Sequence, residues 1–302
     1  MDINKYYKNC TLCPRNCHID RSAGLFGFCG QDMTPKVAKA YPHMWEEPCI
    51  SGENGSGTVF FCGCNLKCVY CQNKQISRAS SAGKPMSDKE LCEIYFKLKA
   101  RGVHNINLVT PTHFVPHIVS SVALAKQNGI GLPFVYNTSG YENVETLSLL
   151  KGYIDIYLTD FKYFSNAYAK RYSNISDYRD VAFNAVKEMF SQTNKPAYSK
   201  DGLLKRGTVI RHLILPEMTR DSKRVLKLLY DEFGNSVIYS IMSQYVPFKL
   251  DKKYDEINRK ITPAEYSDVV SYADEIGIEN CYTQCGQAAQ ESFIPDFNCD
   301  EL

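Results

Sequence analysis

From about residue 57 onward, the sequence alternates short runs of β-branched and aromatic residues with longer amphipathic stretches. In chain order, the short runs read GTVFF, NINLV, PFVY, DIYL, TVIRHLIL and VIYSIM. The longer stretches carry helix signals. In residues 87–102, Ser87 and Glu90 form a capping box and Gly102 ends the pattern. Six strands that alternate with helices predict a parallel sheet joined by right-handed crossovers.

This pattern indicates an α/β fold. Six strand–helix units are too few to close an eight-stranded barrel, so a partial barrel and an open doubly wound sheet both fit. We predict a partial (β/α)6 TIM-type barrel with a C-terminal extension over residues 56–302. Residues 1–55 hold many Gly, Pro and Cys residues with little periodicity, which predicts an irregular cysteine-rich N-terminal module that binds metal. A second irregular stretch is expected near residues 161–180.

Polar residues follow the end of each predicted strand. They are the cysteines of residues 62–71, then Thr110 to His113, Asn137 to Gly140, Asp160 with Lys162, Pro216 with Glu217, and Ser243 to Tyr245. Any one of these sets could be an ordinary turn. Because ligands of parallel α/β folds bind at the carboxyl ends of the strands, six such sets together predict an active site there.

Composition narrows the function classes. The formal charge is +2, from 35 Lys and Arg against 33 Asp and Glu, so no overall field favours nucleic acid or an anionic membrane. No apolar run approaches the ~20 residues of a transmembrane helix, and the first residues lack the pattern of a secretory signal. We expect a cytoplasmic protein. In a reducing compartment, the 13 cysteines indicate metal ligands or reactive thiols rather than disulfides.

Three of these cysteines, Cys64, Cys68 and Cys71, have the spacing C-x3-C-x2-C directly after the first predicted strand. A disulfide uses two cysteines, and a structural zinc site uses four ligands. Three thiolates suit an iron–sulfur cube whose fourth iron is open to a substrate or cofactor. The sequence therefore favours such a cluster at the first strand end.

The motif, with Tyr70 just before its last cysteine, resembles that of the radical S-adenosylmethionine (SAM) superfamily. A narrower resemblance covers nearly the whole chain, through segments such as CTLCPRNCHIDRSAGLFGFC, ISGENGSGTVFFCGCNLKCVYCQN, NINLVTPTHF, VYNTSGY and YLTDFKY. These look like a family of iron–sulfur proteins related to the activating enzyme of pyruvate formate-lyase.

The superfamily resemblance implies a [4Fe-4S] cluster on Cys64, Cys68 and Cys71, whose open iron chelates SAM. It also implies an electron donor such as flavodoxin or ferredoxin. One electron then cleaves SAM to a 5′-deoxyadenosyl radical, which abstracts a hydrogen atom from the substrate. Tyr70 is expected to pack near the adenine of SAM.

Comparison with the activating enzymes implies further site residues. Their Gly-Gly-Glu corresponds here to Thr110-Pro111-Thr112, and their Asp-Thr-Asn-Gly to Asn137-Thr138-Ser139-Gly140. Their Asp-x-Lys is kept as Asp160-x-Lys162, where the lysine is expected to meet the carboxylate of SAM. In those enzymes the two Asp residues help to hold a monovalent cation, so Asn137 puts that cation in doubt. At the end of the fifth strand, Arg211 and His212 are adjacent, and because strand residues alternate between the two faces, only one of them is expected to point inward. The expected cofactor-binding residues are Tyr70, Thr110, Thr112, Asn137, Ser139, Asp160, Lys162 and His212.

A second set of cysteines lies at the front of the chain, with the spacing C-x2-C-x3-C-x11-C. Its members are Cys10, Cys13, Cys17 and Cys29. Four cysteines in a small irregular module suit structural zinc, whereas the close spacing and the Cys13-Pro14 step also suit a second [4Fe-4S] cluster. Both alternatives remain open. Farther along, Trp45, Glu46, Glu47 and Cys49 are expected to join this module to the barrel.

The first functional hypothesis is hydrogen abstraction from a backbone glycine of a partner enzyme. A second is radical modification of a small molecule or a peptide side chain, and a third is a non-catalytic zinc protein that makes interactions. Near the C-terminus, Cys281 and Cys285 are either packed thiols or, for Cys285, a radical relay.

Overall fold

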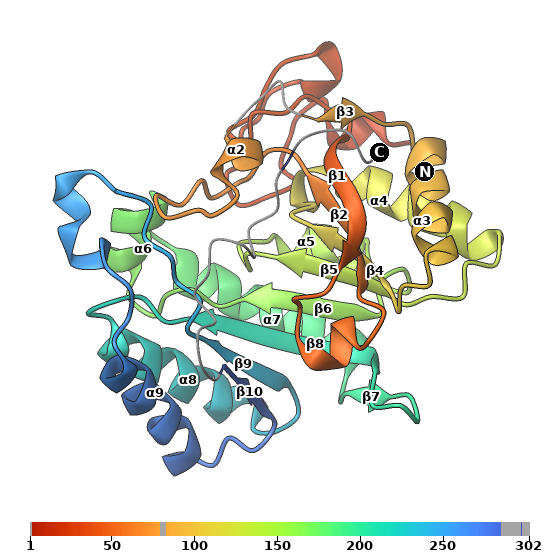
Figure 1. The fold of residues 1–302 in the computed structure, drawn as a ribbon. Helices are drawn as coiled ribbons and strands as arrows, with labels where there is room; N and C mark the ends of the chain where they lie inside the picture. Colours follow the sequence, from red (N-terminus) through yellow and green to blue (C-terminus); the bar gives the residue numbers. More distant parts are fainter. Residues whose placement is uncertain (1, 79–82, 285–296, 298–302) are drawn as a thin grey trace.

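The computed structural model describes residues 2–78, 83–284 and 297. Its centre is a twisted open sheet with the strand order β10-β9-β8-β6-β5-β4-β2-β1-β3 (Figure 1). The six predicted strands are present and run parallel to one another; they are β2 (Ser56–Phe61), β4 (Ile106–Val109), β5 (Phe134–Thr138), β6 (Ile156–Asp160), β8 (Leu204–Leu213) and β9 (Ile238–Met242). Among the described residues, no pairing joins the two edges of the sheet. The predicted α/β fold class is confirmed.

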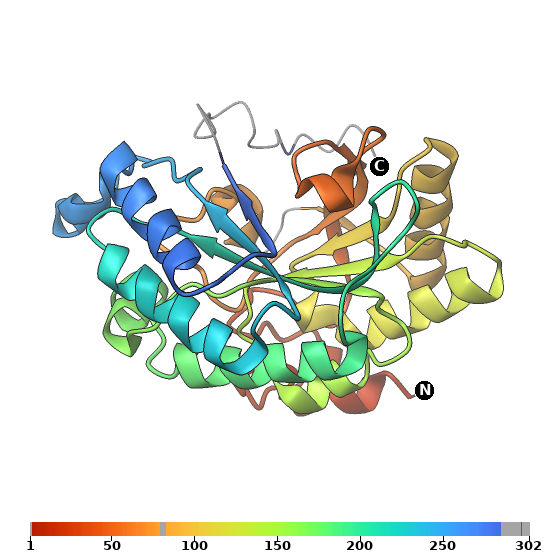
Figure 2. The ribbon, with the colours of Figure 1, turned by 90° about the horizontal axis from the view of Figure 1, so that it is seen from below.

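Helices cover the convex face of the sheet (Figure 2). They include α3 (Asp88–Ala100), α4 (Val115–Gln127), α5 (Val144–Ser148), α7 (Tyr178–Thr193) and α8 (Thr219–Phe233), with α9 (Pro263–Glu275) beside α8. The predicted capping box of Ser87 and Glu90 is present at the start of α3, and Thr262 with Glu265 forms another at α9. Within the described residues, no helix is long and apolar enough to cross a bilayer.

Strand alternation decides which side chains face the concave side. Val135, Ile156, Leu158, Val209 and Ile238 form a small core there together with Cys49 and Ile50. The last two belong to the short helix α1 (Pro48–Ser51), which lies on the concave side of the sheet in Figure 2. The N-terminal segment therefore fills part of the barrel interior. The remaining space lies at the carboxyl ends of the strands.

The expectation of an irregular N-terminal module needs one correction. Residues 36–43 form strand β1 (Lys36–His43), which pairs antiparallel with β2 and also with the short β3 (Lys84–Pro85). The segment has weak periodicity, and it becomes a strand because the edge of β2 offers it backbone partners. Two further short strands extend the sheet: β7 (Ala197–Tyr198) pairs with β8, and β10 (Cys281–Thr283) pairs with β9.

The stretch near residues 161–180 also holds more structure than predicted. It contains helix α6 (Asn166–Ser173) and the first turn of α7. Another short helix, α2 (Lys74–Ser77), follows the cysteine loop. Cys281 lies in β10 and packs against the core that contains α8 and α9. Cys285, considered above as a relay, and Cys299 lie outside the described residues.

Candidate active site

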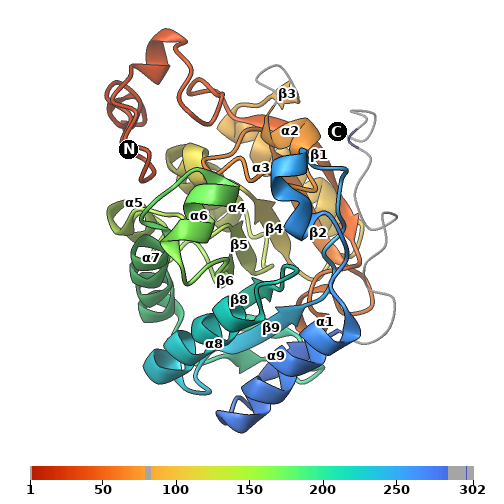
Figure 3. The ribbon, with the colours of Figure 1, turned by 90° about the vertical axis from the view of Figure 1, so that its left-hand side faces the viewer.

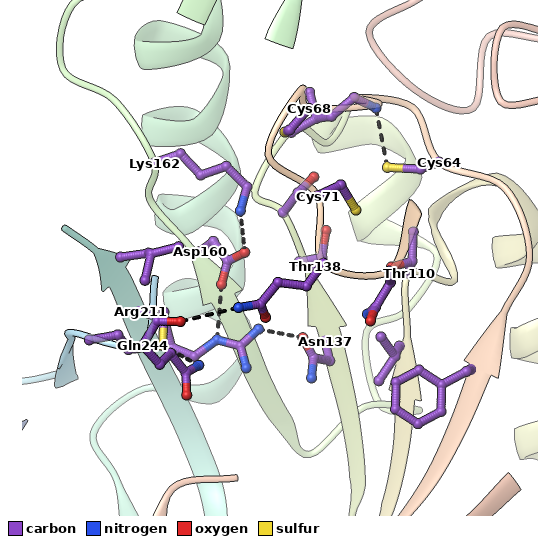
Figure 4. Close-up of a pocket in the computed structure, with 18 of the residues that line it drawn as sticks. Cys64, Cys68, Cys71, Thr110, Asn137, Thr138, Asp160, Lys162, Arg211 and Gln244 are labelled. Carbon is purple, nitrogen blue, oxygen red and sulfur yellow. Dashed lines mark hydrogen bonds and ion pairs between the residues drawn. The ribbon is translucent and has the colours of Figure 1, made fainter. Parts of the chain in front are cut away.

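A cleft opens at the carboxyl ends of the parallel strands, as predicted (Figure 4). Every predicted strand contributes to its lining, which includes Cys64, Cys68, Cys71, Thr110, Asn137, Thr138, Ser139, Asp160, Lys162, Arg211, Leu213, Met242 and Gln244. Side chains that are distant in the sequence therefore meet in one site.

The cysteine loop leaves β2 through Gly63, whose φ of 85° suits glycine. Each thiol of the loop has a hydrogen-bond partner: the Leu66 N–H donates to Cys64 Sγ at 3.3 Å, while Cys68 and Cys71 pair with the hydroxyls of Ser173 and Ser77 at 2.9 and 3.5 Å. All three thiols line the same cleft. Hydrogen-bond donors of this kind stabilise thiolate ligands of iron–sulfur clusters, so the residues fit such a cluster.

The helix that sequence reasoning missed braces this loop. The Val69 N–H donates to the Tyr172 carbonyl at 2.9 Å, and both Tyr172 and Ser173 belong to the end of α6. Tyr70 lies in the cleft wall, and its packing against the adenine of SAM stays a prediction. Its hydroxyl is 2.6 Å from that of Tyr163, and its ring packs edge-on against Tyr172 and Tyr245.

A network of charged side chains forms the floor of the cleft. Arg211 donates from Nε to Asp160 Oδ1 at 2.9 Å and from Nη2 to Asn137 Oδ1 at 2.6 Å, and its Nη1 lies 3.2 Å from Glu46 Oε2. Lys162 Nζ lies 2.6 Å from the other oxygen of Asp160. The guanidinium thus joins the ends of β5 and β6 to the N-terminal segment.

Electrostatics keeps Asp160 and Lys162 ionised. Burial alone would raise the pKa of Asp160, but the neighbouring charges of Lys162 and Arg211 hold that pKa below its ordinary value. Burial likewise opposes the charge on Lys162, but the charge and hydrogen bond of Asp160, together with the neighbouring Cys68, raise the lysine pKa above its ordinary value. At the cleft edge, burial and Arg211 lower the pKa of His43 to about 4, so its imidazole is neutral at pH 7.

Most of the predicted site residues line the cleft, but Thr112 and His212 do not. His212 neighbours Arg211 in β8, and adjacent residues of a strand face opposite sides. Arg211 points into the concave side, whereas the buried His212 places Nδ1 2.7 Å from the Phe161 carbonyl. Thr112 is buried behind the cleft and donates to Glu142 Oε1 at 2.5 Å. Arg211 and Thr110 take the positions that face the cofactor space.

Sequence reasoning did not assign Glu46, His43 and Trp45 to the cleft, although all three line it. They come from β1 and the residues after it, which carry no recognisable motif. Glu46 also accepts from Asn107 Nδ2 at 2.9 Å, so the expected junction between the N-terminal segment and the barrel is present. Because these residues precede the first barrel strand and carry no motif, the sequence does not indicate that they lie inside the barrel.

The four front cysteines lie next to the cysteine loop, since the Cys64 N–H donates to the Cys29 carbonyl at 3.3 Å. Cys10, Cys13 and Cys29 are buried, and Cys17 is half-buried. Across the described part of the chain, no three Cys, His, Asp or Glu side chains converge as a group able to hold a single metal ion. The metal of this module therefore stays a prediction.

Comparison with known proteins identifies the family. Residues 58–229 match the model of the radical SAM superfamily. The uncharacterized protein MJ0674 of Methanocaldococcus jannaschii is 30% identical over 287 residues, which cover 91% of this chain and 77% of that protein.

Solved structures resemble the fold. Methylornithine synthase (PylB) has a TM-score of 0.50 and 13% identity over 73% of this chain and 68% of its own. A radical SAM methyltransferase from Sphaerobacter thermophilus has a TM-score of 0.47 and 11% identity, over 75% of this chain and 65% of its own. At such identities the likeness to the synthase concerns the fold alone. The family match and the cysteine loop agree, and the chain belongs to the radical SAM superfamily, whose members are enzymes that use a [4Fe-4S] cluster and SAM.

Proposed function

We propose that this enzyme abstracts a hydrogen atom from a polypeptide segment that enters the cleft from the open side of the sheet, with a backbone glycine as the target. Cys64, Cys68 and Cys71 would hold the [4Fe-4S] cluster, which would supply the electron for reductive cleavage of SAM. The chain's own residues bind and orient SAM and the substrate.

For SAM, the carboxylate partner in this proposal is Lys162, which is charged and lies on the cleft wall beside the cysteine loop. Thr110 lines the cleft at the end of β4, where its N–H donates to the Asn137 carbonyl at 2.9 Å. Its φ of 57° is unusual for a β-branched residue. Ser139 and Asn137 contribute the polar wall at the end of β5. Tyr70 provides an aromatic face for the adenine.

The exposure of Trp45 at the cleft is the observation that supports a polypeptide substrate. Its side chain is 62% exposed although it lines the cleft, and the preceding Met44 is 43% exposed. Large apolar side chains exposed at the rim of a catalytic cleft indicate a contact surface for another chain. Among the described residues, no strand pairing closes the sheet, and in this proposal the other chain approaches from that open side.

A second candidate substrate is a small charged metabolite. The observation in its favour is that the charged side chains of Glu46 and Arg211 both line the cleft. Both lie on the cleft lining and bring opposite charges to one place. Their charges are already engaged, because Arg211 contacts Glu46, Asp160 and Asn137 together. A ligand would have to displace these contacts, so the geometry favours the polypeptide.

The test follows deuterium from the substrate into 5′-deoxyadenosine. Source cells are grown in deuterated medium, and their extract is divided by size into a protein fraction and a small-molecule fraction. Reduced holoenzyme and SAM are then incubated with each fraction. Deuterium transfer from the protein fraction supports the proposal, and transfer from the small-molecule fraction alone contradicts it. A Cys64→Ala variant gives the background, and an extract labelled only with dideuterated glycine tests the glycyl target.

A further inference from the structure

We infer that the four front cysteines bind a second metal centre, packed directly behind the catalytic cysteine loop. This inference does not depend on the substrate proposed above. The thiolates are supplied by Cys10, Cys13, Cys17 and Cys29. The ligands suit a thiophilic metal. Because no three of these side chains converge as a single-ion site within the described residues, a [4Fe-4S] cluster fits them better than a single Zn²⁺.

Backbone hydrogen bonds bring the front thiols together. Cys10 pairs with the segment after Cys17, because its N–H donates to the Ile19 carbonyl at 3.0 Å and its carbonyl accepts from the His18 N–H at 3.1 Å. Gly27 lies between two other members of the set: a Cβ at this position would be 3.5 Å from both Cys17 Sγ and Cys29 Sγ. The fold therefore brings near one another the segments that carry Cys10, Cys17 and Cys29, which are up to 19 positions apart in the sequence.

A buried positive charge faces these thiols. Arg21 is 1% exposed, and its guanidinium bonds to the carbonyls of Gln31, Asp32 and His113 and to Cys10 Sγ at 3.6 Å. Among the described residues, it has no ion pair with a carboxylate. A guanidinium stays protonated in proteins, and an uncompensated buried charge is expensive.

Metal-bound thiolates would supply the missing negative charge. Four thiolates carry −4, and Zn²⁺ and the oxidised [4Fe-4S] core each contribute +2, so either centre has a net charge of −2. The surroundings also contain donors that suit metal-bound sulfur. The Phe28 N–H donates to Cys17 Sγ at 3.3 Å, beside the Arg21 contact to Cys10. Donors of this kind orient and stabilise metal ligands.

The centre would lie against the catalytic loop, because Cys29 and Cys64 are joined by a backbone hydrogen bond. Figure 3 shows the N-terminal segment near α5 and α6, and Arg15 from this module donates from Nε to the Asn65 carbonyl at 2.8 Å. A metal that fixes the front module would thereby fix one side of the loop that carries the catalytic cysteines.

The experiment isolates the front site by removing the catalytic one. A Cys64→Ala/Cys68→Ala/Cys71→Ala variant is purified and reconstituted without oxygen, and its iron, sulfide and zinc are counted per chain. We expect about four irons with sulfide, or about one zinc, and the further substitutions Cys10→Ala and Cys29→Ala to remove that metal. A Cys92→Ala substitution in the triple variant is the matched control and leaves the metal in place.

Arg21 is tested as a positioning residue in the same background. Arg21→Lys keeps the charge and Arg21→Met removes it, so the methionine variant should release metal to a chelator at about tenfold lower chelator concentration than the lysine variant. Equal metal retention by these two variants would overturn the counter-charge role. A triple variant that keeps the circular dichroism of the wild type but binds no stoichiometric metal would overturn the site itself.

Discussion

Arg211 brings a positive charge to the strand ends where, by the resemblance to the activating enzymes, a bound cation would be expected. In those enzymes two Asp residues at neighbouring strand ends help to hold a monovalent cation, and here one of the two is Asn137. The guanidinium of Arg211 contacts Asn137, Asp160 and Glu46 together. The positive charge is therefore built into the chain, and we predict that SAM cleavage by the wild type needs no added potassium or sodium.

The Arg211→Ala substitution should lower the free energy of unfolding by about 3 kcal/mol, because it removes the ion-pair partner of the largely buried Glu46 carboxylate and one of the two cations beside Asp160. Arg211→Lys should cost less, since the charge stays. Denaturation is measured in potassium chloride and, at equal ionic strength, in tetramethylammonium chloride, whose cation is too large for the gap. Potassium should partly restore only the alanine variant. Equal effects of the two salts would contradict the account.

Glu142 predicts a pH dependence of stability. It is fully buried, accepts from Thr112, and also bonds to the hydroxyls of Thr138 and Tyr136. Burial raises its pKa from 4.5 to about 7. In the folded state the proton is therefore held more tightly than in the unfolded chain. Between pH 4.5 and 7, the contribution of Glu142 to the free energy of unfolding therefore falls as the pH rises, by about 3 kcal/mol in total.

A Glu142→Gln variant should lack this contribution, because its side chain does not titrate. Anaerobic chemical denaturation of both proteins across pH 5 to 8 gives the difference between their free energies of unfolding. That difference should shift in favour of the glutamine variant as the pH rises toward 7. A constant difference across the range would show that Glu142 does not titrate in this window.

The cofactor residues illustrate what a sequence can predict at this scale. Cys64, Cys68, Cys71, Asp160 and Lys162 follow strands with clear boundaries, and all line the cleft. The choice between Arg211 and His212 depended on strand register, which cannot be read from a run with two polar residues in succession. The location of Glu46 in the cleft could not be predicted from the sequence, because it depends on tertiary packing alone.

At the scale of elements, the cysteine loop and the front module meet at Gly63. A Cβ on this residue would lie 2.6 Å from Gln31 Cγ and 2.7 Å from the Cys29 carbonyl oxygen. Its φ is 85°. Gly102 offers a matched control, since its φ is 81° but no atom lies within 4 Å of a Cβ built there.

Both Gly63→Ala and Gly102→Ala introduce left-handed strain of about 1 kcal/mol. We predict that only Gly63→Ala also pushes the loop away from the front module, so that it loses about 2 kcal/mol more stability and binds less iron. Unfolding curves and iron counts of the two variants provide the comparison. Identical iron content in both would mean that the contact does not position the catalytic cysteines.

The strands and helices with strong periodicity were predicted, and the short elements were not. The parallel strands and their long helices carry both pattern and caps, and they appear within a few residues of the expected positions. Strand β1 and helix α6 have weak local signals, and each exists through a partner: β1 pairs with β2, and α6 packs on the cysteine loop. Local sequence does not contain that information.

At the scale of the whole molecule, the open sheet and the N-terminal segment together shape the entrance to the cleft. Trp45 lies at this entrance and is predicted to bind the substrate rather than SAM. Trp45→Ala should reduce substrate-dependent hydrogen abstraction about tenfold and leave substrate-free SAM cleavage nearly unchanged. Leu25→Ala, at a residue that is 53% exposed and does not line the cleft, is the control and should alter neither rate.

The central claim is that Cys64, Cys68 and Cys71 form the site of SAM cleavage. The most direct measurement is the formation of 5′-deoxyadenosine and methionine by anaerobically reconstituted, reduced protein, run beside the Cys64→Ala/Cys68→Ala/Cys71→Ala variant. The account predicts both products in equal amounts from the wild type and none above background from the variant. If wild-type protein with full iron and sulfide content forms no more 5′-deoxyadenosine than the variant, the assignment of this cleft as the radical site is wrong.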